Sequence, residues 1–252
     1  LHLASRRQRQ MCIRDRNSTA NALLSVGASP VMAHSQHEVE DIVNISSSLV
    51  LNMGTLSKKW IESMIIAGKK AKSTGKPVVF DPVGVGASNY RTKTAEKIIS
   101  QVKPDIIRGN ASEIMVLAQL STISKGVDST SETSEAIQGA KILSKKLDCT
   151  IVISGAVDCI VTGNKVNTIG NGSPLMSKVT GMGCTATSII GACIAVEKNI
   201  HKAAVSAMAI MGVVGEKTEE LSKGPGSFQA NFLDTLHNIN SEDIKSKTNL
   251  DG

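Results

Sequence analysis

The stretch SSLVLNMGTLSKKWIESMIIAGKKAKSTGKPVVFD, residues 47–81, decides the fold. It opens with a continuous apolar run over residues 47–53, which is typical of a strand buried on both faces. Residues 57–73 predict a helix that begins after Ser57 and ends before Gly75. The run VVFD, residues 78–81, predicts the next strand. Such a strand–helix–strand unit predicts two parallel strands with the helix packed on one face of their sheet.

The same alternation continues along the chain. We expect helices over residues 17–26, 38–45, 90–102, 110–120, 133–147, 184–197, 202–217 and 228–240, and strands over residues 105–108 and 149–154. Residues 158–162 and 165–169 flank a Gly-Asn turn and predict a hairpin. Repeated units of this kind predict a three-layer α/β domain with a mostly parallel central sheet and helices on both faces.

Composition favours one globular domain and argues against a nucleic-acid-binding face. Of the 252 residues, 41% are hydrophobic and 20% charged, close to globular averages. Only 2% are aromatic, so stacking on nucleic-acid bases is not expected. The net charge is +6, but residues 1–16 hold five arginines and one acid, which is +4 of that charge and leaves +2. A basic face for DNA or a membrane is therefore not expected.

Cysteine use and the length of the apolar runs favour a cytoplasmic protein. The five cysteines are odd in number and form no Cys-x-x-Cys pair, which favours reduced thiols. The most apolar stretch, residues 186–196, is interrupted by polar residues and is shorter than the ~20 residues of a membrane span. We expect neither a membrane nor a nucleic-acid partner.

The two ends of the chain differ in character from the rest. Residues 1–16, LHLASRRQRQMCIRDR, show neither a helical nor a strand period, and we interpret them as a non-native or disordered segment. Residues 17–243 are expected to form the domain, truncated at its N-terminal side. Residues 244–252 are expected to be a frayed tail.

A glycine turn and a strand end are the first two candidate sites. VTGMGCTA, residues 179–186, precedes an apolar helix, and the N–H groups and dipole at a helix start favour phosphate. The alternative is an ordinary helix-entry turn. Asp81 ends a strand and opens the glycine-rich loop DPVGVGA, where open α/β sheets bind ligands. Asp81 is a candidate Mg²⁺ ligand, although Asp-Pro is also common in turns.

Two further strand ends carry polar side chains. Arg108 follows a strand and is a candidate phosphate clamp. Glu113 lies three residues after Asn110, which predicts a capping box at the start of the next helix. Ser154 ends the strand IVIS and is either a nucleotide donor or a turn residue. The carboxyl ends of parallel strands meet at one edge, so these segments are expected to lie together.

Five motifs, in this order, resemble the hydroxyethylthiazole kinases of the ribokinase-like superfamily. They are NxTAN from residue 17, GASPVM from residue 27, DPVGxGA from residue 81, GNxSE from residue 109 and VTGxGC from residue 179. The resemblance covers residues 17–232. DPVG and GNxSE also occur in other ribokinase-like vitamin kinases, whereas SPVM and the cysteine at 184 are more particular to the thiazole kinases.

The resemblance implies transfer of a phosphoryl group from ATP, with Mg²⁺, to the hydroxyl of 4-methyl-5-(2-hydroxyethyl)thiazole in thiamine salvage. It also implies a homotrimer with its sites between subunits. The site residues that it implies are Met32 and Gly181 for the substrate, Arg108 and Ser154 for ATP, Asp81 and Glu113 for Mg²⁺, and Cys184 as the catalytic base, where relatives carry Asp.

One departure from the family leaves two alternatives open. Family members start earlier, with a strand and a Leu-Val-His-x-Ile-Thr-Asn-type segment where this chain has its arginine-rich residues 1–16. The first alternative is another vitamin-precursor kinase of the superfamily, acting on a hydroxymethylpyrimidine, against which Cys184 argues. The second is a catalytically dead ligand-binding protein.

Overall fold

The unit at residues 47–81 forms as its sequence predicts. Residues 9–11, 16–121 and 132–252 are described by the structure, a computed structural model. The first apolar run becomes strand β3 (Ser48–Asn52), which is buried throughout. Helix α3 (Lys58–Ser73) begins after Ser57, whose hydroxyl accepts a backbone N–H of its first turn. Strand β4 (Val78–Asp81) then pairs with β3 in parallel.

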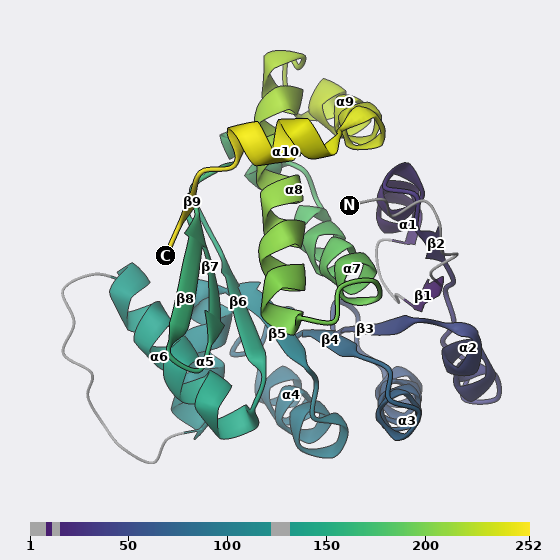
Figure 1. Cartoon of the computed structure of the whole chain (residues 1–252). Coiled ribbons are helices and arrows are strands. Elements are labelled where there is room, and N and C mark those ends of the chain that lie inside the picture. Colours follow the sequence, from purple (N-terminus) through teal and green to yellow (C-terminus); the bar gives the residue numbers. More distant parts are fainter. Residues whose placement is uncertain (1–8, 12–15, 122–131) are drawn as a thin grey trace.

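One sheet contains every strand of the described residues. Beside β3 and β4 these are β1 (Arg9–Met11), β2 (Ser29–Pro30), β5 (Ile106–Asn110), β6 (Thr150–Ser154), β7 (Asp158–Thr162), β8 (Lys165–Ile169) and β9 (Leu250–Asp251). The order is β2-β1-β3-β4-β5-β6-β7-β8-β9 (Figure 1). From β2 to β6 the neighbours are parallel, and from β6 to β9 they are antiparallel. The mostly parallel sheet and the β7–β8 hairpin are confirmed.

Helices cover both faces of this sheet. The helices other than α3 are α1 (Arg16–Ser25), α2 (Val39–Ile45), α4 (Asn89–Val102), α5 (Ala111–Ser121), α6 (Glu132–Leu147), α7 (Met182–Ile194), α8 (Ile200–Glu220), α9 (Pro225–Asn238) and α10 (Ser241–Lys247). Figure 1 shows α3 and α4 on one side of the sheet and α7 and α8 on the other. The expected three-layer architecture is confirmed.

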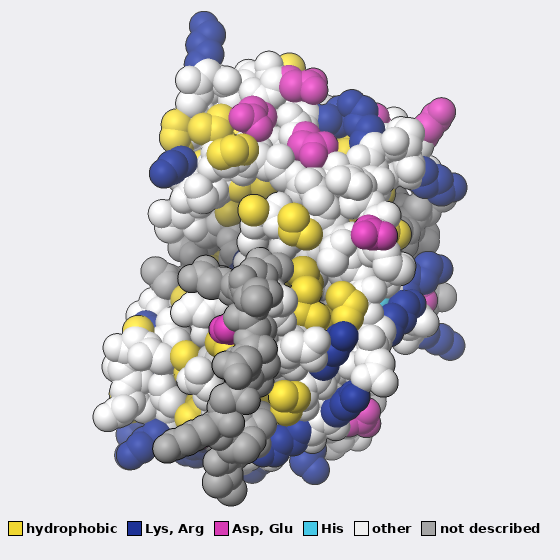
Figure 2. Space-filling view, turned by 90° about the vertical axis from the view of Figure 1, so that its left-hand side faces the viewer, with side chains coloured by type: hydrophobic (Ala, Val, Ile, Leu, Met, Phe, Trp, Pro, Cys, Tyr) yellow, Lys and Arg dark blue, Asp and Glu magenta, His cyan; other side chains and the backbone are white. Residues whose placement is uncertain are grey.

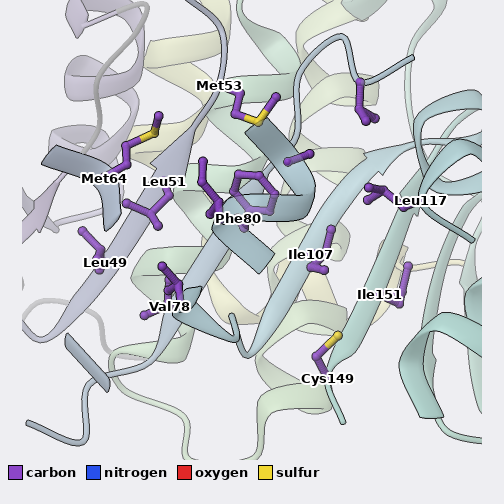
Figure 3. Packing of buried hydrophobic residues seen from close by; sticks show 14 of the residues in the cluster. Leu49, Leu51, Met53, Met64, Val78, Phe80, Ile107, Leu117, Cys149 and Ile151 are labelled. Atoms are coloured by element: carbon purple, nitrogen blue, oxygen red, sulfur yellow. The ribbon is translucent and has the colours of Figure 1, made fainter. Parts of the chain in front are cut away.

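Each face of the sheet has its own apolar core. Leu49 and Leu51 belong to the cluster under helices α2 to α6, whereas Val50 belongs to the cluster under α1 and α7 to α9. This division follows from the alternation of side chains along a strand. Figure 3 shows Leu51 beside Phe80 of the neighbouring strand in the first cluster. Because both faces are covered, the central strands β3, β4 and β6 are mostly continuous apolar runs in the sequence.

Both ends of the described chain correct the sequence expectation. Within the segment expected to be non-native or disordered, Arg9–Met11 form β1, between β2 and β3. The expected frayed tail is wrong, because residues 244–252 hold the end of α10 and strand β9, and Leu250 pairs with Ile169. Strands of two or three residues are too short to show a period-two pattern. Cys12 and the arginines at positions 6, 7 and 14 lie outside the described residues.

The surface carries both signs of charge. On the face that Figure 2 shows, Lys and Arg side chains are interspersed with Asp and Glu side chains. Within the described ranges, the helices are either too short or too polar to cross a lipid bilayer.

Candidate active site

The site lies where four neighbouring parallel strands end. Asn52 on β3 stands opposite Asp81 on β4, and Arg108 on β5 lies beside β6, whose last residue is Ser154. Parallel strands present their carboxyl ends at one edge, which is where open α/β sheets bind ligands. The start of helix α7 reaches the same edge, because Thr187 of this helix contacts Asp81. The sheet thus gathers residues that are far apart in the sequence.

Asp81 is at the centre of this cluster. Its side chain is 1% exposed. Its Oδ2 accepts hydrogen bonds from Thr187 Oγ1 at 2.7 Å and Asn52 Nδ2 at 3.1 Å, and lies 3.8 Å from Arg108 Nη1. Burial raises the pKa of Asp81 to about 6, while Arg108 and the Thr187 hydroxyl act in the opposite direction. Its other oxygen, Oδ1, is buried and has no hydrogen-bond partner in the described part of the chain.

Arg108 is held between a strand end and the glycine turn. Its Nη2 donates to Ser154 Oγ at 2.5 Å. A Cβ at Gly183 would stand 2.6 Å from Arg108 Nη1, so only glycine lets the turn approach the guanidinium this closely. Arg108 Nε is a buried donor that has no partner among the described residues. An anion at this position would complete its hydrogen bonding.

The glycine turn starts helix α7 as an anion-binding turn would. Gly181 is the N-cap and has φ 90°, a left-handed conformation that favours glycine. Cys184 lies in the first turn of the helix and is 8% exposed. The helix begins at Met182, two residues before the expected start, so Cys184 is its third residue rather than its first. The free N–H groups and the dipole of this end favour a negative charge beside Cys184.

Glu113 forms the capping box that its spacing predicts. Its backbone N–H donates to Asn110 Oδ1 at 2.9 Å, and its Oε2 accepts the Asn110 N–H at 2.9 Å. Its Oε1 accepts the N–H of Gly84 at 2.7 Å. Glu113 therefore ties the loop after Asp81 to the start of α5. Gly84 has φ 72°, which suits a glycine at this turn.

Several functional candidates were missed in the sequence. Asn52 and Thr187 contact Asp81, but both lie inside apolar runs and look like core positions there. Asp158 is 8% exposed and its Oδ1 accepts the Gly155 N–H at 3.0 Å, next to Ser154. Burial raises the pKa of Asp158 to about 6. The signal in the sequence that could have identified Asp158 is an acid at the start of an apolar strand, close after Ser154-Gly155.

Met32 lies apart from the cluster. It is half-buried and follows β2, the strand at the far end of the sheet, with β1 and β3 between it and β4.

A cavity of about 270 Å³ opens beside the glycine turn, between α1, α9 and the start of α7. Thr180, Met182 and Thr185 line its turn side. The place of this cavity next to the glycine turn makes it a candidate for a small organic ligand.

The donor set fits Mg²⁺ held together with a nucleotide. Asp81 Oδ1 leaves a buried carboxylate oxygen for a ligand outside the chain. Both Glu113 oxygens accept backbone N–H groups. In the part that the structure describes, no three His, Cys, Asp or Glu side chains gather as a metal cage. Mg²⁺ commonly keeps several waters and binds one or two carboxylates plus substrate phosphates, so it needs no such cage.

A comparison with family models identifies the chain. The model described as "Hydroxyethylthiazole kinase family" matches residues 13–242. The chain belongs to the hydroxyethylthiazole kinase family. The expected family is therefore confirmed. Of its five motifs, DPVGxGA, GNxSE and VTGxGC lie at the edge of the sheet described above, whereas NxTAN lies in α1 and GASPVM at β2.

Curated relatives match over most of their length. The hydroxyethylthiazole kinase of Leptospira biflexa serovar Patoc is 51% identical over 233 residues, which cover 92% of this chain and 87% of the relative. The hydroxyethylthiazole kinase of Syntrophus aciditrophicus is 48% identical over 235 residues, with 93% and 87% covered. The chain thus carries most of the length of a hydroxyethylthiazole kinase.

Solved structures support the fold as well as the family. The hydroxyethylthiazole kinase protein from Pyrococcus horikoshii OT3 superposes with a TM-score of 0.91 at 34% identity, over 99% of this chain and 95% of that one. A ribokinase-like superfamily protein from Enterococcus faecalis V583 superposes with a TM-score of 0.69 at 13% identity, over 91% and 86%. The second likeness concerns the fold alone and confirms the ribokinase-like class. The roles of individual residues stay predictions.

Proposed function

We propose that this chain transfers a phosphoryl group from ATP to the hydroxyl of 4-methyl-5-(2-hydroxyethyl)thiazole, as a step of thiamine salvage. The observation that carries the proposal is the Asp81–Arg108 pair against the α7 turn, in a chain 51% identical to a hydroxyethylthiazole kinase. Phosphoryl transfer needs positioning and neutralisation of negative charge, and a guanidinium beside a helix start offers both.

The ATP side of the site belongs to Arg108 and Ser154. The unpartnered Nε of Arg108 is available to a phosphate oxygen, and Ser154 Oγ fixes the other end of the guanidinium. Gly181 and Met32 are proposed to bind the alcohol. Met32 is separated from the cluster by two strands of the same chain, so its role agrees with a site completed by a neighbouring subunit.

Asp81 and Glu113 are proposed to organise Mg²⁺, which supplies charge neutralisation on the transferred phosphate when bound. Asp81 has the free oxygen for this task. Glu113 holds the Gly84 loop through its Oε1, and in that way keeps the segment after Asp81 in place. Asp81 therefore binds the ion, and Glu113 fixes the position of the loop.

Cys184 is proposed to accept the proton of the substrate hydroxyl. In the reaction the alcohol oxygen forms a bond to the γ-phosphorus, the bond from this phosphorus to the β–γ bridging oxygen breaks, and ADP leaves. The proton passes from the alcohol to the Cys184 thiolate. A thiol at a helix start is more readily a thiolate, because the dipole end favours the negative form.

Two further properties belong to this proposal. We propose that the active form is a homotrimer and that the protein is cytoplasmic. Among the described residues, Cys149, Cys159, Cys184 and Cys193 form no disulfide, which supports a reducing location.

A comparison of two alcohols tests the proposal. With MgATP, kcat/KM for the thiazole alcohol should exceed that for a hydroxymethylpyrimidine by about a hundredfold or more. The relatives at 51% and 48% identity favour a working thiazole kinase over the pyrimidine alternative and over a dead binding protein. Equal or reversed values would overturn the substrate assignment, and binding without turnover would overturn the enzyme.

A further inference from the structure

Asn52 makes three side-chain contacts at the centre of the site. It ends β3 and is 1% exposed. Its Oδ1 accepts the N–H of Gly54 at 2.7 Å. Its Nδ2 donates to Asp81 Oδ2 at 3.1 Å and to Cys184 Sγ at 3.3 Å. One buried amide therefore touches both the acid proposed for Mg²⁺ and the thiol proposed as the base.

The amide can adopt only one orientation in these surroundings. The Gly54 N–H is a donor and must face the amide oxygen, which leaves the NH₂ group for the other two contacts. The NH₂ group has two hydrogens and two acceptors within reach, Asp81 Oδ2 and Cys184 Sγ. The sulfur thus accepts a hydrogen bond from the amide. Hydrogen bonds donated to a titratable atom favour its charged form, here the thiolate.

We propose that Asn52 is a positioning residue of the transfer site, which holds the Asp81 carboxylate and the Cys184 sulfur in one geometry by donating a hydrogen bond to each. This inference rests on the proposed function, since it assigns Asn52 a part in the same reaction. Asn52 occupies Oδ2 of Asp81 together with Thr187 and so leaves Oδ1 for a ligand. At the same time its hydrogen bond to Cys184 Sγ fixes the position of the sulfur.

The matched substitution is Asn52→Asp. An aspartate keeps the size of the side chain, and its Oδ1 still accepts the Gly54 N–H. Its second oxygen replaces both donated hydrogen bonds with an acceptor that faces Asp81 and the sulfur. Asn52→Ala removes the same bonds without adding charge and serves as the second variant, so that a folding defect of one does not decide the outcome.

Three measurements on the full chain separate positioning from mere packing. We expect kcat to fall ~10–100-fold in both variants, the size typical of second-layer partners of a site, while KM for ATP and the alcohol changes less than about threefold. Iodoacetamide should alkylate Cys184 about tenfold more slowly in Asn52→Asp, as followed by mass spectrometry of its peptide. In a Cys184→Ala background, Asn52→Asp should lower kcat by a smaller factor than in the parent, because the effects of coupled residues are not additive.

Asn167→Asp is the matched control. Asn167 is another buried asparagine of the same sheet, 6% exposed on β8, where it contacts His201 and the end of the chain. The Asn167→Asp variant should have a lower unfolding temperature than the parent, but the same kcat and the same alkylation rate of Cys184.

The outcomes are distinct. If folded Asn52→Asp and Asn52→Ala keep both the parent kcat and the parent alkylation rate, or if the effects with Cys184→Ala are additive, Asn52 is only a packing residue and the inference is overturned. If the parent transfers no phosphoryl group at all, the proposed function fails instead. The alkylation rates then still decide whether Asn52 controls the state of Cys184.

Discussion

Asp81 shows what a single residue reveals in the sequence and what it does not. Its place at a strand end, before a glycine-rich loop, made it a candidate site residue, and the structure brings Arg108 and helix α7 to it. Its partners Asn52 and Thr187 were not predicted. They lie 29 and 106 residues away in the chain and inside apolar segments, so no local pattern marks them as polar contacts of Asp81.

Cys184 offers a direct test of the base assignment. Phosphoryl transfer has a loose transition state, so proton removal contributes toward the lower end of the usual ~10²–10⁴-fold for a general base. Cys184→Ala should therefore slow single-turnover transfer by about a hundredfold, and Cys184→Asp should stay active because it supplies an ionised base. Parent rates in Cys184→Ala together with a dead Cys184→Asp would leave only the anion-binding turn.

The buried carboxyl of Asp81 predicts a pH dependence of stability. Burial raises its pKa from 3.8 to about 6, so the folded protein binds more protons than the unfolded chain between these values. This contribution is present below pH ~4 and is lost as pH rises through ~6. Relative to Asp81→Asn, the parent should lose up to about 3 kcal/mol of unfolding free energy over that range. Urea titrations without Mg²⁺ or nucleotide measure this, and a difference independent of pH would refute it.

At the scale of elements, the sequence pattern was sufficient to predict the longer helices and the buried strands. The apolar runs and caps of β3, α3, β4 and α6 predicted their bounds to within one or two residues. Two short strands, β1 and β9, and helix α10 were missed, because their residues carry no apolar period and are ordered by tertiary contacts. Asn171 Oδ1, for example, accepts the N–H of Asn249 just before β9.

The C-terminal end of helix α2 is capped by Lys76, a lysine of the connection between α3 and β4. Lys76 Nζ donates to the carbonyl oxygens of Val43, Asn44 and Ser46, each at 2.6 Å. A cation at a helix C-terminus satisfies carbonyls that have no partner within the helix. Lys76→Met should lower the unfolding free energy by about 1 kcal/mol. Lys69→Met, on the exposed side of α3, is the control, and an equal effect of the two variants would exclude the capping role.

At the scale of the whole molecule, the alternation of elements predicted the architecture but not the assembly. A parallel sheet with two covered faces follows from buried strands joined by helices. Assembly depends on surface shape, which leaves no periodic pattern in the sequence. The position of Met32 beside an end strand, away from the Asp81 cluster, agrees with a site shared between subunits.

Light scattering tests this assembly. We predict a trimer at micromolar concentration, with Met32 and its neighbours near a subunit boundary. Met32→Asp should weaken the trimer or raise KM for the alcohol, because a charge in a half-buried contact is costly. A monomer with full activity would contradict the shared site.

The most direct measurement of the central claim is transfer of the γ-phosphoryl group to the thiazole alcohol, followed by ³¹P NMR, in the parent and in Asp81→Ala. The account predicts that the parent forms the thiazole monophosphate and ADP in equal amounts. Asp81→Ala should form them at least about a hundredfold more slowly, because the charge on the transferred group is no longer compensated. An unchanged rate in folded Asp81→Ala, or ADP without phosphorylated thiazole in the parent, would contradict it.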